Sequence, residues 1–141
     1  MNYKEKMENS TFLRRAGAIF YDSLLLFSVL LFATIPAVVV TGGSAIDQGN
    51  RFFQFYLLLI SLIYFIIPWK IRGQTLGMQS WKIKLVQETG EQITWGQAVK
   101  RFLFSLLSWL PGGLGFFWIL FDRDKKAWHD RLSTSRIIHL K

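Results

Sequence analysis

Apolar residues along this chain gather in three long blocks, not at the spacing of core-facing helices. The blocks are residues 17–40, interrupted by the single charge of Asp22, and residues 52–69 and 102–121, which carry no charge. A hydrocarbon core about 30 Å thick takes about 20 helical residues to cross. The first two blocks therefore predict transmembrane helices. Three buried helices of a soluble protein are excluded, because 141 residues are too few to wrap three uncharged helices of this length.

The third block is broken at its centre by Pro111-Gly112-Gly113. Proline removes a backbone donor, and two glycines allow a sharp reversal of the chain. The halves on either side, Phe102–Leu110 and Leu114–Phe121, each reach about 12–14 Å, roughly half of a bilayer. This pattern favours a re-entrant helical hairpin that packs on the first two helices or on a second copy, with a third span as the alternative.

Residues between the second and third blocks alternate like a strand and predict a small cytoplasmic β-sheet. Gly73–Gly77 forms a turn that starts a short interfacial helix, and residues 83–86 continue an apolar–polar alternation. Gln92–Thr94 is predicted as a return strand. Because a lone hairpin is marginal, we expect the tail, residues 135–140, to pair with residues 83–86. Thr94, with Gln97 three residues on, fits a capping box that opens the next helix.

The distribution of basic residues along the chain predicts its orientation in the membrane. The chain has 17 Lys and Arg against 9 Asp and Glu, a formal net charge of +8. Residues 1–16 hold four basic residues, 70–101 six and 122–141 six, whereas the loop 41–51 holds one. Basic residues near membrane spans stay mostly in the cytoplasm. The sequence therefore predicts a multi-pass protein of the bacterial cytoplasmic (inner) membrane with both termini in the cytoplasm.

Composition is consistent with one membrane domain. Charged residues make up 18% of the chain, below the roughly 25% of an average soluble domain. The first apolar run is longer than the roughly 7–15 residues of a signal peptide core, so it is expected to stay as an anchor. The predicted parts are a cytoplasmic N-terminus (1–16), span 1 (17–40), an external loop (41–51), span 2 (52–69), a cytoplasmic segment (70–101), a broken apolar helix (102–121) and a cytoplasmic tail (122–141).

Several function classes are unlikely on chemical grounds, and we expect neither enzyme activity nor a cofactor. The chain has no cysteine, which excludes disulfides, iron–sulfur clusters and a cysteine nucleophile. It has no Walker A loop and no dinucleotide fingerprint. His129 and His139 lack metal-ligand spacing. The basic excess follows from membrane orientation, so we expect no nucleic-acid partner.

Asp22 is the most informative polar residue. A carboxylate inside a spanning helix is costly and usually faces protein or water. It lies about 9 Å along the helix from Ala16, close to the cytoplasmic edge. We expect it to face the interior within reach of an arginine, with Arg15 and Arg101 as candidates. It is then either a proton or cation site or an Asp–Arg clamp that fixes helix packing.

Asp130 lies beside His129, beyond the last apolar residue. One interpretation is a helix cap or a cytoplasmic salt bridge. The other is a second carboxylate near Asp22 that shares a proton or ion with it.

Six short motifs in a fixed order resemble the RDD family of bacterial membrane proteins, from about Phe12 to Leu140. The motifs are Arg14-Arg15, Asp22, Gly73–Gly77, Ile93–Arg101, Phe121-Asp122-Arg123 and Trp128–Leu132. The family is named for one Arg and two Asp. The resemblance implies that these are Arg15 (or Arg14), Asp22 and Asp130, supported by Arg101, His129 and Asp122. Transport of a ligand has been suggested for the family, with cation/proton exchange as one version, so the resemblance implies an architecture and three residues but no defined reaction.

Two function classes follow for a small α-helical membrane protein of this kind, whose first partner is the lipid bilayer. The first is a transporter or ion exchanger, expected to be a homo-oligomer because two spans and a hairpin do not easily enclose a path. The second is an accessory or structural subunit that binds another membrane protein. Polar residues are few in the second block, with Gln54, Ser61 and Tyr64 among them. The accessory alternative therefore stays close to the transporter.

Overall fold

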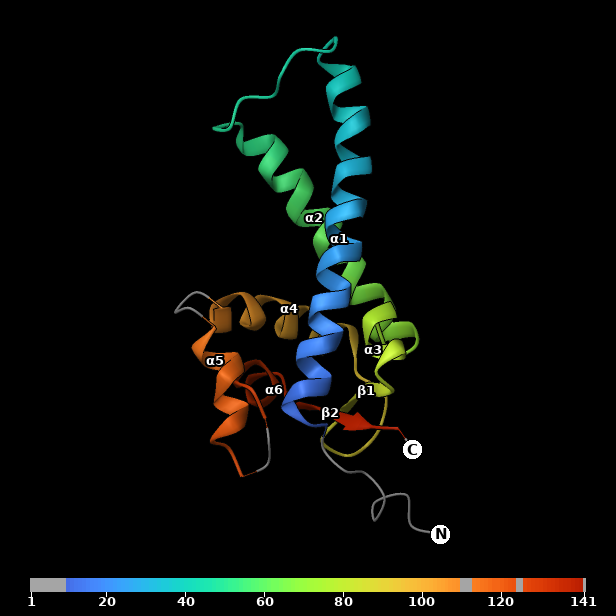
Figure 1. Ribbon diagram of the computed structural model, residues 1–141, viewed down its shortest axis with the longest axis vertical. Helices are drawn as coiled ribbons and strands as arrows, with labels where there is room; N and C mark the ends of the chain where they lie inside the picture. Colours follow the sequence, from blue (N-terminus) through green and yellow to red (C-terminus); the bar gives the residue numbers. More distant parts are fainter. Residues whose placement is uncertain (1–9, 110–112, 124–125, 141) are drawn as a thin grey trace.

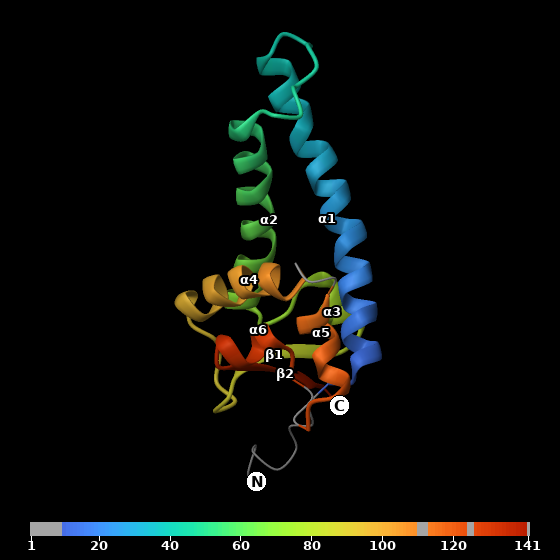
Figure 2. The ribbon, with the colours of Figure 1, turned by 90° about the vertical axis from the view of Figure 1, so that its left-hand side faces the viewer.

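Two long helices rise from a compact base in the computed structural model of the chain, which describes residues 10–109, 113–123 and 126–140. Helix α1 comprises Phe12–Val40 and helix α2 Arg51–Ile71, and both project from the base in the two views of Figures 1 and 2. The remaining elements form the base. Both predicted spans are confirmed as helices, with bounds wider than their apolar blocks because polar residues at their ends continue the helical turns.

The outer surfaces of α1 and α2 are apolar and uncovered. Within the described residues, these two helices are long and apolar enough to cross a membrane. Large side chains such as Phe27 and Phe32 are exposed. Such continuous apolar surfaces along two whole helices are costly in water but match the hydrocarbon of a bilayer. Tyr56 joins the two helices by donating a hydrogen bond to the Ala33 carbonyl over 3.0 Å.

The sheet has two antiparallel strands, β1 (Ile83–Gln87) and β2 (Ser135–His139), paired from Ile83 opposite His139 to Gln87 opposite Ser135. The predicted pairing of the tail with residues 83–86 is thus confirmed. The predicted return strand at Gln92–Thr94 is wrong. The Gly73 carbonyl already accepts from the Leu85 N–H over 2.7 Å, so that segment does not occupy the second edge of β1.

Helix α3 (Leu76–Ser80) follows the Gly73–Gly77 turn as predicted, and α4 (Trp95–Trp109) follows the predicted capping box. The box forms in both directions: the Thr94 N–H donates to Gln97 Oε1 over 3.0 Å, and the Gln97 N–H donates to Thr94 Oγ1 over 3.2 Å. Figures 1 and 2 both show α4 lying across the base of the molecule, crosswise to the two long helices and against the lower end of α2.

The third apolar block does not form one continuous helix in the described residues. Helix α4 ends at Trp109, and the short α5 (Leu114–Phe117) and the 3₁₀ turn η2 (Trp118–Leu120) follow Gly113, which has a φ of +84°. Pro111 and Gly112 lie outside the described residues. The predicted break is therefore present, while the path of the two arms relative to the membrane stays a prediction.

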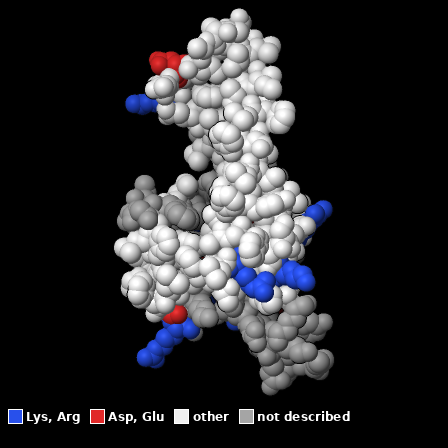
Figure 3. Space-filling view, in the orientation of Figure 1, with Lys and Arg blue, Asp and Glu red and all other residues white. Residues whose placement is uncertain are grey.

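The two described ends of the chain meet at the base. The Ser10 N–H donates to the Ile137 carbonyl of β2 over 3.0 Å. The loop 41–50 lies at the far end of the long helices (Figure 1). Figure 3 shows most of the Lys and Arg on its face near the base, and a long uncharged surface separates them from the few charges at the far end. This arrangement agrees with both ends lying on one side, and the identity of that side stays a prediction.

A buried core at the base fixes these elements. It joins side chains of α1, α2, α3, both strands, α4 and the segment that precedes α4. Its members are Ala18, Ile66, Trp69, Met78, Ile83, Leu85, Ile93, Ala98, Phe102 and Ile137.

Candidate functional site

Asp130 is the centre of a buried ionic cluster. It lies in the first turn of α6 (Trp128–Leu132), where its carboxylate accepts from the Ala127 N–H over 3.0 Å. Arg15 Nη1 of α1 donates to Asp130 Oδ2 over 2.5 Å, and Arg101 Nη1 of α4 donates to Asp130 Oδ1. All three side chains are at least 95% buried. One carboxylate thus joins three helices that are remote in sequence, and Asp130 serves as both a cap and a salt bridge.

Hydroxyl groups complete the positioning of the two guanidiniums. Arg15 Nε donates to Ser10 Oγ over 2.9 Å, and Arg101 Nη1 donates to Ser135 Oγ over 3.1 Å. Arg101 also lies 5.5 Å from the centre of the Trp69 ring, within the range of a cation–π contact.

The electrostatics keep Asp130 charged and His129 neutral. Burial alone would raise the pKa of the Asp130 carboxyl, but the charges of Arg101 and Arg15 outweigh it and hold that pKa well below its ordinary range. For His129, burial and the nearby Arg101 charge lower the pKa to about 3. At neutral pH the cluster of Arg15, Arg101 and Asp130 therefore carries one net positive charge, to which His129 adds none.

Asp22 is bound by neutral donors from α2 and the α3 segment. Its Oδ1 accepts from the Tyr64 hydroxyl over 3.1 Å and from the Gly77 N–H over 2.9 Å, and its Oδ2 accepts from the Thr75 hydroxyl. Thr75 also caps α3 by accepting from the Met78 N–H over 3.2 Å. The carboxylate faces the protein interior, as predicted.

The predicted pairing of Asp22 with an arginine is wrong. No Lys or Arg of the described residues lies within ion-pair distance of it, because Arg15 and Arg101 are both bound to Asp130. The start of α3 supplies the donors instead, and it approaches α1 closely. A Cβ added at Gly77 would lie 2.7 Å from Asp22 Cγ, so this position requires glycine.

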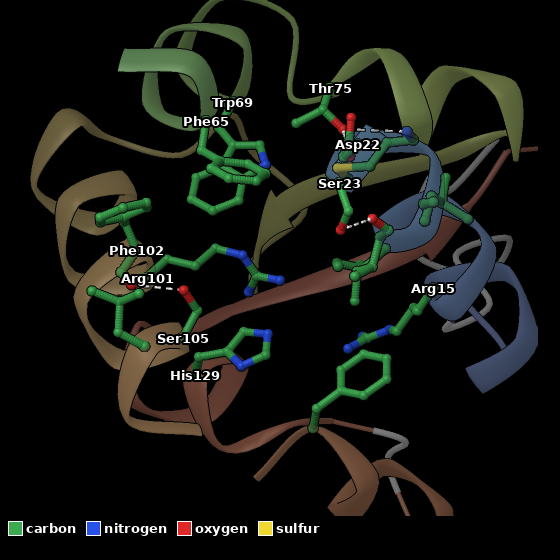
Figure 4. A pocket seen from close by; sticks show the side chains of 17 residues that line it. Arg15, Asp22, Ser23, Phe65, Trp69, Thr75, Arg101, Phe102, Ser105 and His129 are labelled. Carbon is green, nitrogen blue, oxygen red and sulfur yellow. Dashed lines mark hydrogen bonds between the residues drawn. The ribbon is translucent and has the colours of Figure 1, made fainter. Parts of the chain in front are cut away.

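A cavity of about 360 Å³ lies between the two carboxylate sites. Asp22 and Thr75 border one part of it, and Arg15, Arg101 and His129 border another. Figure 4 shows the guanidinium groups of Arg15 and Arg101 directed into this space. The remaining wall is mostly apolar, with Ile19, Phe65, Trp69, Met78, Phe102 and Phe116 among its side chains.

Arg14 and Asp122 lie elsewhere. Arg14 Nη1 donates to the Trp81 carbonyl over 3.2 Å near the surface, so the buried member of the Arg14-Arg15 pair is Arg15. Asp122 pairs with Arg131 and accepts from the Lys126 N–H over 3.0 Å. Neither residue borders the cavity.

Sequence reasoning missed the neutral partners of the site. Thr75 and Gly77 stood in a quoted motif, and Tyr64 was one of few polar residues in the second span, so a signal existed for these three. Ser10, Ser135 and Trp69 carried no signal. Across the described residues, no group of three or more His, Asp and Glu side chains is arranged to hold a metal ion.

Comparison with known sequences identifies the relatives of this chain. A match to the RDD family extends over residues 10–134, nearly the whole chain. The chain belongs to the RDD family. Of the residues that the resemblance led us to expect as its name-giving positions, Arg15 (or Arg14), Asp22 and Asp130, three are buried in the structure, namely Arg15, Asp22 and Asp130. Family membership and two exposed apolar helices together identify an RDD membrane protein.

Two relatives of this RDD protein have names that assign no function to them. Uncharacterized protein YxaI of Bacillus subtilis (strain 168) is 32% identical over 85 residues, which are 59% of this chain and 55% of YxaI. Uncharacterized protein RP437 of Rickettsia prowazekii (strain Madrid E) is 29% identical over 119 residues, 84% of this chain and 54% of RP437. This RDD protein thus spans about half the length of both. No solved structure matches it significantly.

Proposed function

We propose that this RDD protein binds a ligand for transport across the bacterial cytoplasmic membrane, with the cavity at the base of α1 and α2 as the binding site. The observation that supports this proposal is that polar side chains from several helices meet at one cavity. Arg15, Asp22, Arg101 and His129 come from three helices, α1, α4 and α6, and border one largely apolar space. Pockets between helices with a few convergent polar groups are typical of ligand sites.

Transport requires more than one copy in this proposal. Two spanning helices do not enclose a path, so a second copy or another membrane subunit would complete it. Exposed aromatic side chains on both helices, among them Phe27, Phe32, Phe52 and Phe55, offer apolar surface for such a contact as well as for lipid. Cross-linking in native membranes would report whether a second copy is present.

A flux experiment with a blocked cavity tests the proposal. Proteoliposomes would be incubated with a bacterial cytoplasmic extract, and the solutes retained inside would be measured by mass spectrometry. We expect the wild-type protein to enrich a solute that Ser105→Phe does not, because Ser105 borders the cavity. Leu107→Phe is the matched control, since Leu107 lies on the exposed face of the same helix. Identical contents with wild-type, Ser105→Phe and empty vesicles would contradict the proposal.

The second candidate is an accessory subunit whose buried carboxylates serve to hold its fold. Asp22 and Asp130 each join helices that are distant in sequence, which is what a packing clamp requires. The clamps differ from the expected Asp22–Arg pair, since the arginines belong to Asp130. Purification in mild detergent distinguishes the candidates: a stoichiometric membrane partner together with no flux would favour the accessory role.

We infer a cytoplasmic location for the base from the charge distribution, with 16 of 17 basic residues outside the loop 41–51. Cysteines introduced at Ser44 and Ser133 test it with an impermeant maleimide on intact cells. Ser44 should react, and Ser133 should not. Because Ser133 is buried, Thr89, which is exposed in the turn after β1, provides a second cysteine position. External labelling of Thr89→Cys would reverse the inferred orientation.

A further inference from the structure

Two buried hydrogen-bond donors at the cavity lack an acceptor. Arg15 Nη2 and Trp69 Nε1 have no hydrogen-bond partner among the described residues, although the two residues are only 2% and 8% exposed. Both residues line the cavity. Buried donors in native proteins are nearly always paired with protein, water or a ligand. Each of these two donors would be satisfied by an oxygen acceptor that reached it from the cavity.

The charge at this part of the cavity is positive. Arg15 and Arg101 share the single carboxylate of Asp130, and His129 is neutral because its pKa is lowered to about 3. Guanidinium groups keep their protons in proteins. The second guanidinium charge of this cluster has no ion-pair partner of its own among the described residues, and Asp22 borders a different part of the cavity. Burying an unpaired charge is costly, so a negatively charged occupant beside Arg15 and Arg101 would be favoured over a neutral one.

Asp22 does not offer the same opportunity to a cation. Its two oxygens already accept three hydrogen bonds, from the Tyr64 hydroxyl, the Thr75 hydroxyl and the Gly77 N–H. A cation would have to displace these donors and remain near two guanidinium groups. The donor set of the cavity thus fits an anion better than a cation.

The rest of the wall sets the body of the occupant. Phe65, Phe102, Phe116 and Ile137 surround the space, and its volume of about 360 Å³ lies in the range of small-molecule pockets. We propose that the cavity binds an anion with a short apolar body, whose negatively charged oxygens accept hydrogen bonds from Arg15 Nη2 and Trp69 Nε1. This inference rests on the proposed function, which makes the cavity the ligand site. The anion is either a free amphiphile or the headgroup of a lipid.

Equilibrium dialysis of octanoate against the protein in phosphatidylcholine nanodiscs tests the proposal, with empty nanodiscs as the blank. We expect saturable binding of octanoate and much weaker binding of octanol and octylamine. Trp69→Phe keeps an aromatic ring but removes the indole donor. It should weaken octanoate binding about tenfold or more, because a hydrogen bond to a charged group is worth about 1.5–3 kcal/mol and 1.4 kcal/mol is tenfold. Trp95→Phe is the matched control, since Trp95 is exposed on α4 and does not border the cavity.

A second readout does not depend on how well Trp69→Phe folds. In protein labelled with ¹⁵N-tryptophan, octanoate should shift one indole N–H signal, and that signal should persist in Trp95→Phe. For the lipid source, thermal stability should rise in phosphatidylglycerol nanodiscs relative to phosphatidylcholine nanodiscs, and octanoate should then not bind in the anionic nanodiscs.

The outcomes separate this inference from the function on which it rests. Octanoate binding that Trp69→Phe weakens supports an anionic ligand and identifies it as a free amphiphile. Stabilisation by phosphatidylglycerol that Trp69→Phe removes also supports an anionic ligand and identifies it as a lipid headgroup. Binding of octylamine or octanol at least as tight as that of octanoate overturns the anion and leaves the cavity as a ligand site. Binding of none of the probes, with no effect of phosphatidylglycerol, overturns both proposals.

Discussion

Replacing Asp130 with Asn would remove the one negative charge between two buried guanidinium groups. Asp130 is fully buried, and its carboxylate is bound to Arg15, Arg101 and the Ala127 N–H. Asn has nearly the same shape, so the substitution changes charge with little change in packing. Its amide group would also present donors to two groups that themselves only donate.

The expected loss is large because the interaction is buried. Removing one partner of a buried ion pair costs about 3–5 kcal/mol, since the other charge is left uncompensated. Glu88→Gln is the matched control: Glu88 pairs with Lys126 but is 46% exposed, and exposed pairs contribute about 0–1 kcal/mol. At about 2–4 °C per kcal/mol, Asp130→Asn should lower the melting temperature by about 6–20 °C.

Thermal unfolding in mild detergent, followed by tryptophan fluorescence, measures this difference. The double variant Asp130→Asn/Arg101→Gln should recover part of the loss, because it removes one of the two charges left unpaired. Residues in direct contact show interaction energies of about 0.5–3 kcal/mol in such cycles. A difference of about 2 °C in melting temperature corresponds to about 1 kcal/mol of stability. If Asp130→Asn melted within about 2 °C of Glu88→Gln, the ionic account of this site would be refuted.

Three further results are expected. Gly77→Ala should destabilise by about 1–3 kcal/mol in the same assay, because its Cβ would overlap the Asp22 carboxylate. Asp22→Asn should fold and lose less stability than Asp130→Asn, because the Asn oxygen still accepts from the Gly77 N–H; a larger loss would contradict the neutral-donor account. Lowering the pH from 7 to 5 should cost about 2 kcal/mol, since the unfolded chain protonates His129 near pH 6.5 while the folded pKa is about 3. His129→Gln should abolish this slope, and His139→Gln should retain it.

Elements with a strong local pattern were predictable from the sequence. The two spans follow from uninterrupted apolar residues, and the β1–β2 pairing follows from alternation together with the need of a short strand for a neighbour. The return strand at Gln92–Thr94 failed for a reason that lies in three dimensions: the Gly73 carbonyl already occupies that edge of β1. Helix α4 begins seven residues before its apolar block, because the capping box, and not hydropathy, sets its start.

The partners of the charged residues were less predictable. Sequence analysis identified Arg15, Asp22, Arg101 and Asp130, and it did not identify which arginine belongs to which aspartate. Arg15 and Asp130 are 115 positions apart, and Asp22 is 55 positions from the Gly77 N–H that binds it. Charge alone made an Asp22–Arg pair attractive. Backbone and hydroxyl donors were invisible in that reasoning, since any residue can supply them once the fold brings it close.

The two carboxylates of this RDD protein are stabilised in opposite ways, and the difference bears on its chemistry. Asp22 is bound by neutral donors, so its own charge has no countercharge among the described residues, whereas Asp130 is shared by two cations that together exceed its charge. The cavity between them is therefore polarised, with its positive part fixed because arginine does not release its proton. A cation or proton exchanger would need a carboxylate free to bind the ion. The Asp22 carboxylate at this cavity already accepts three hydrogen bonds, whereas Arg15 Nη2 and Trp69 Nε1 have no acceptor among the described residues, which is the reason to search first for an anion.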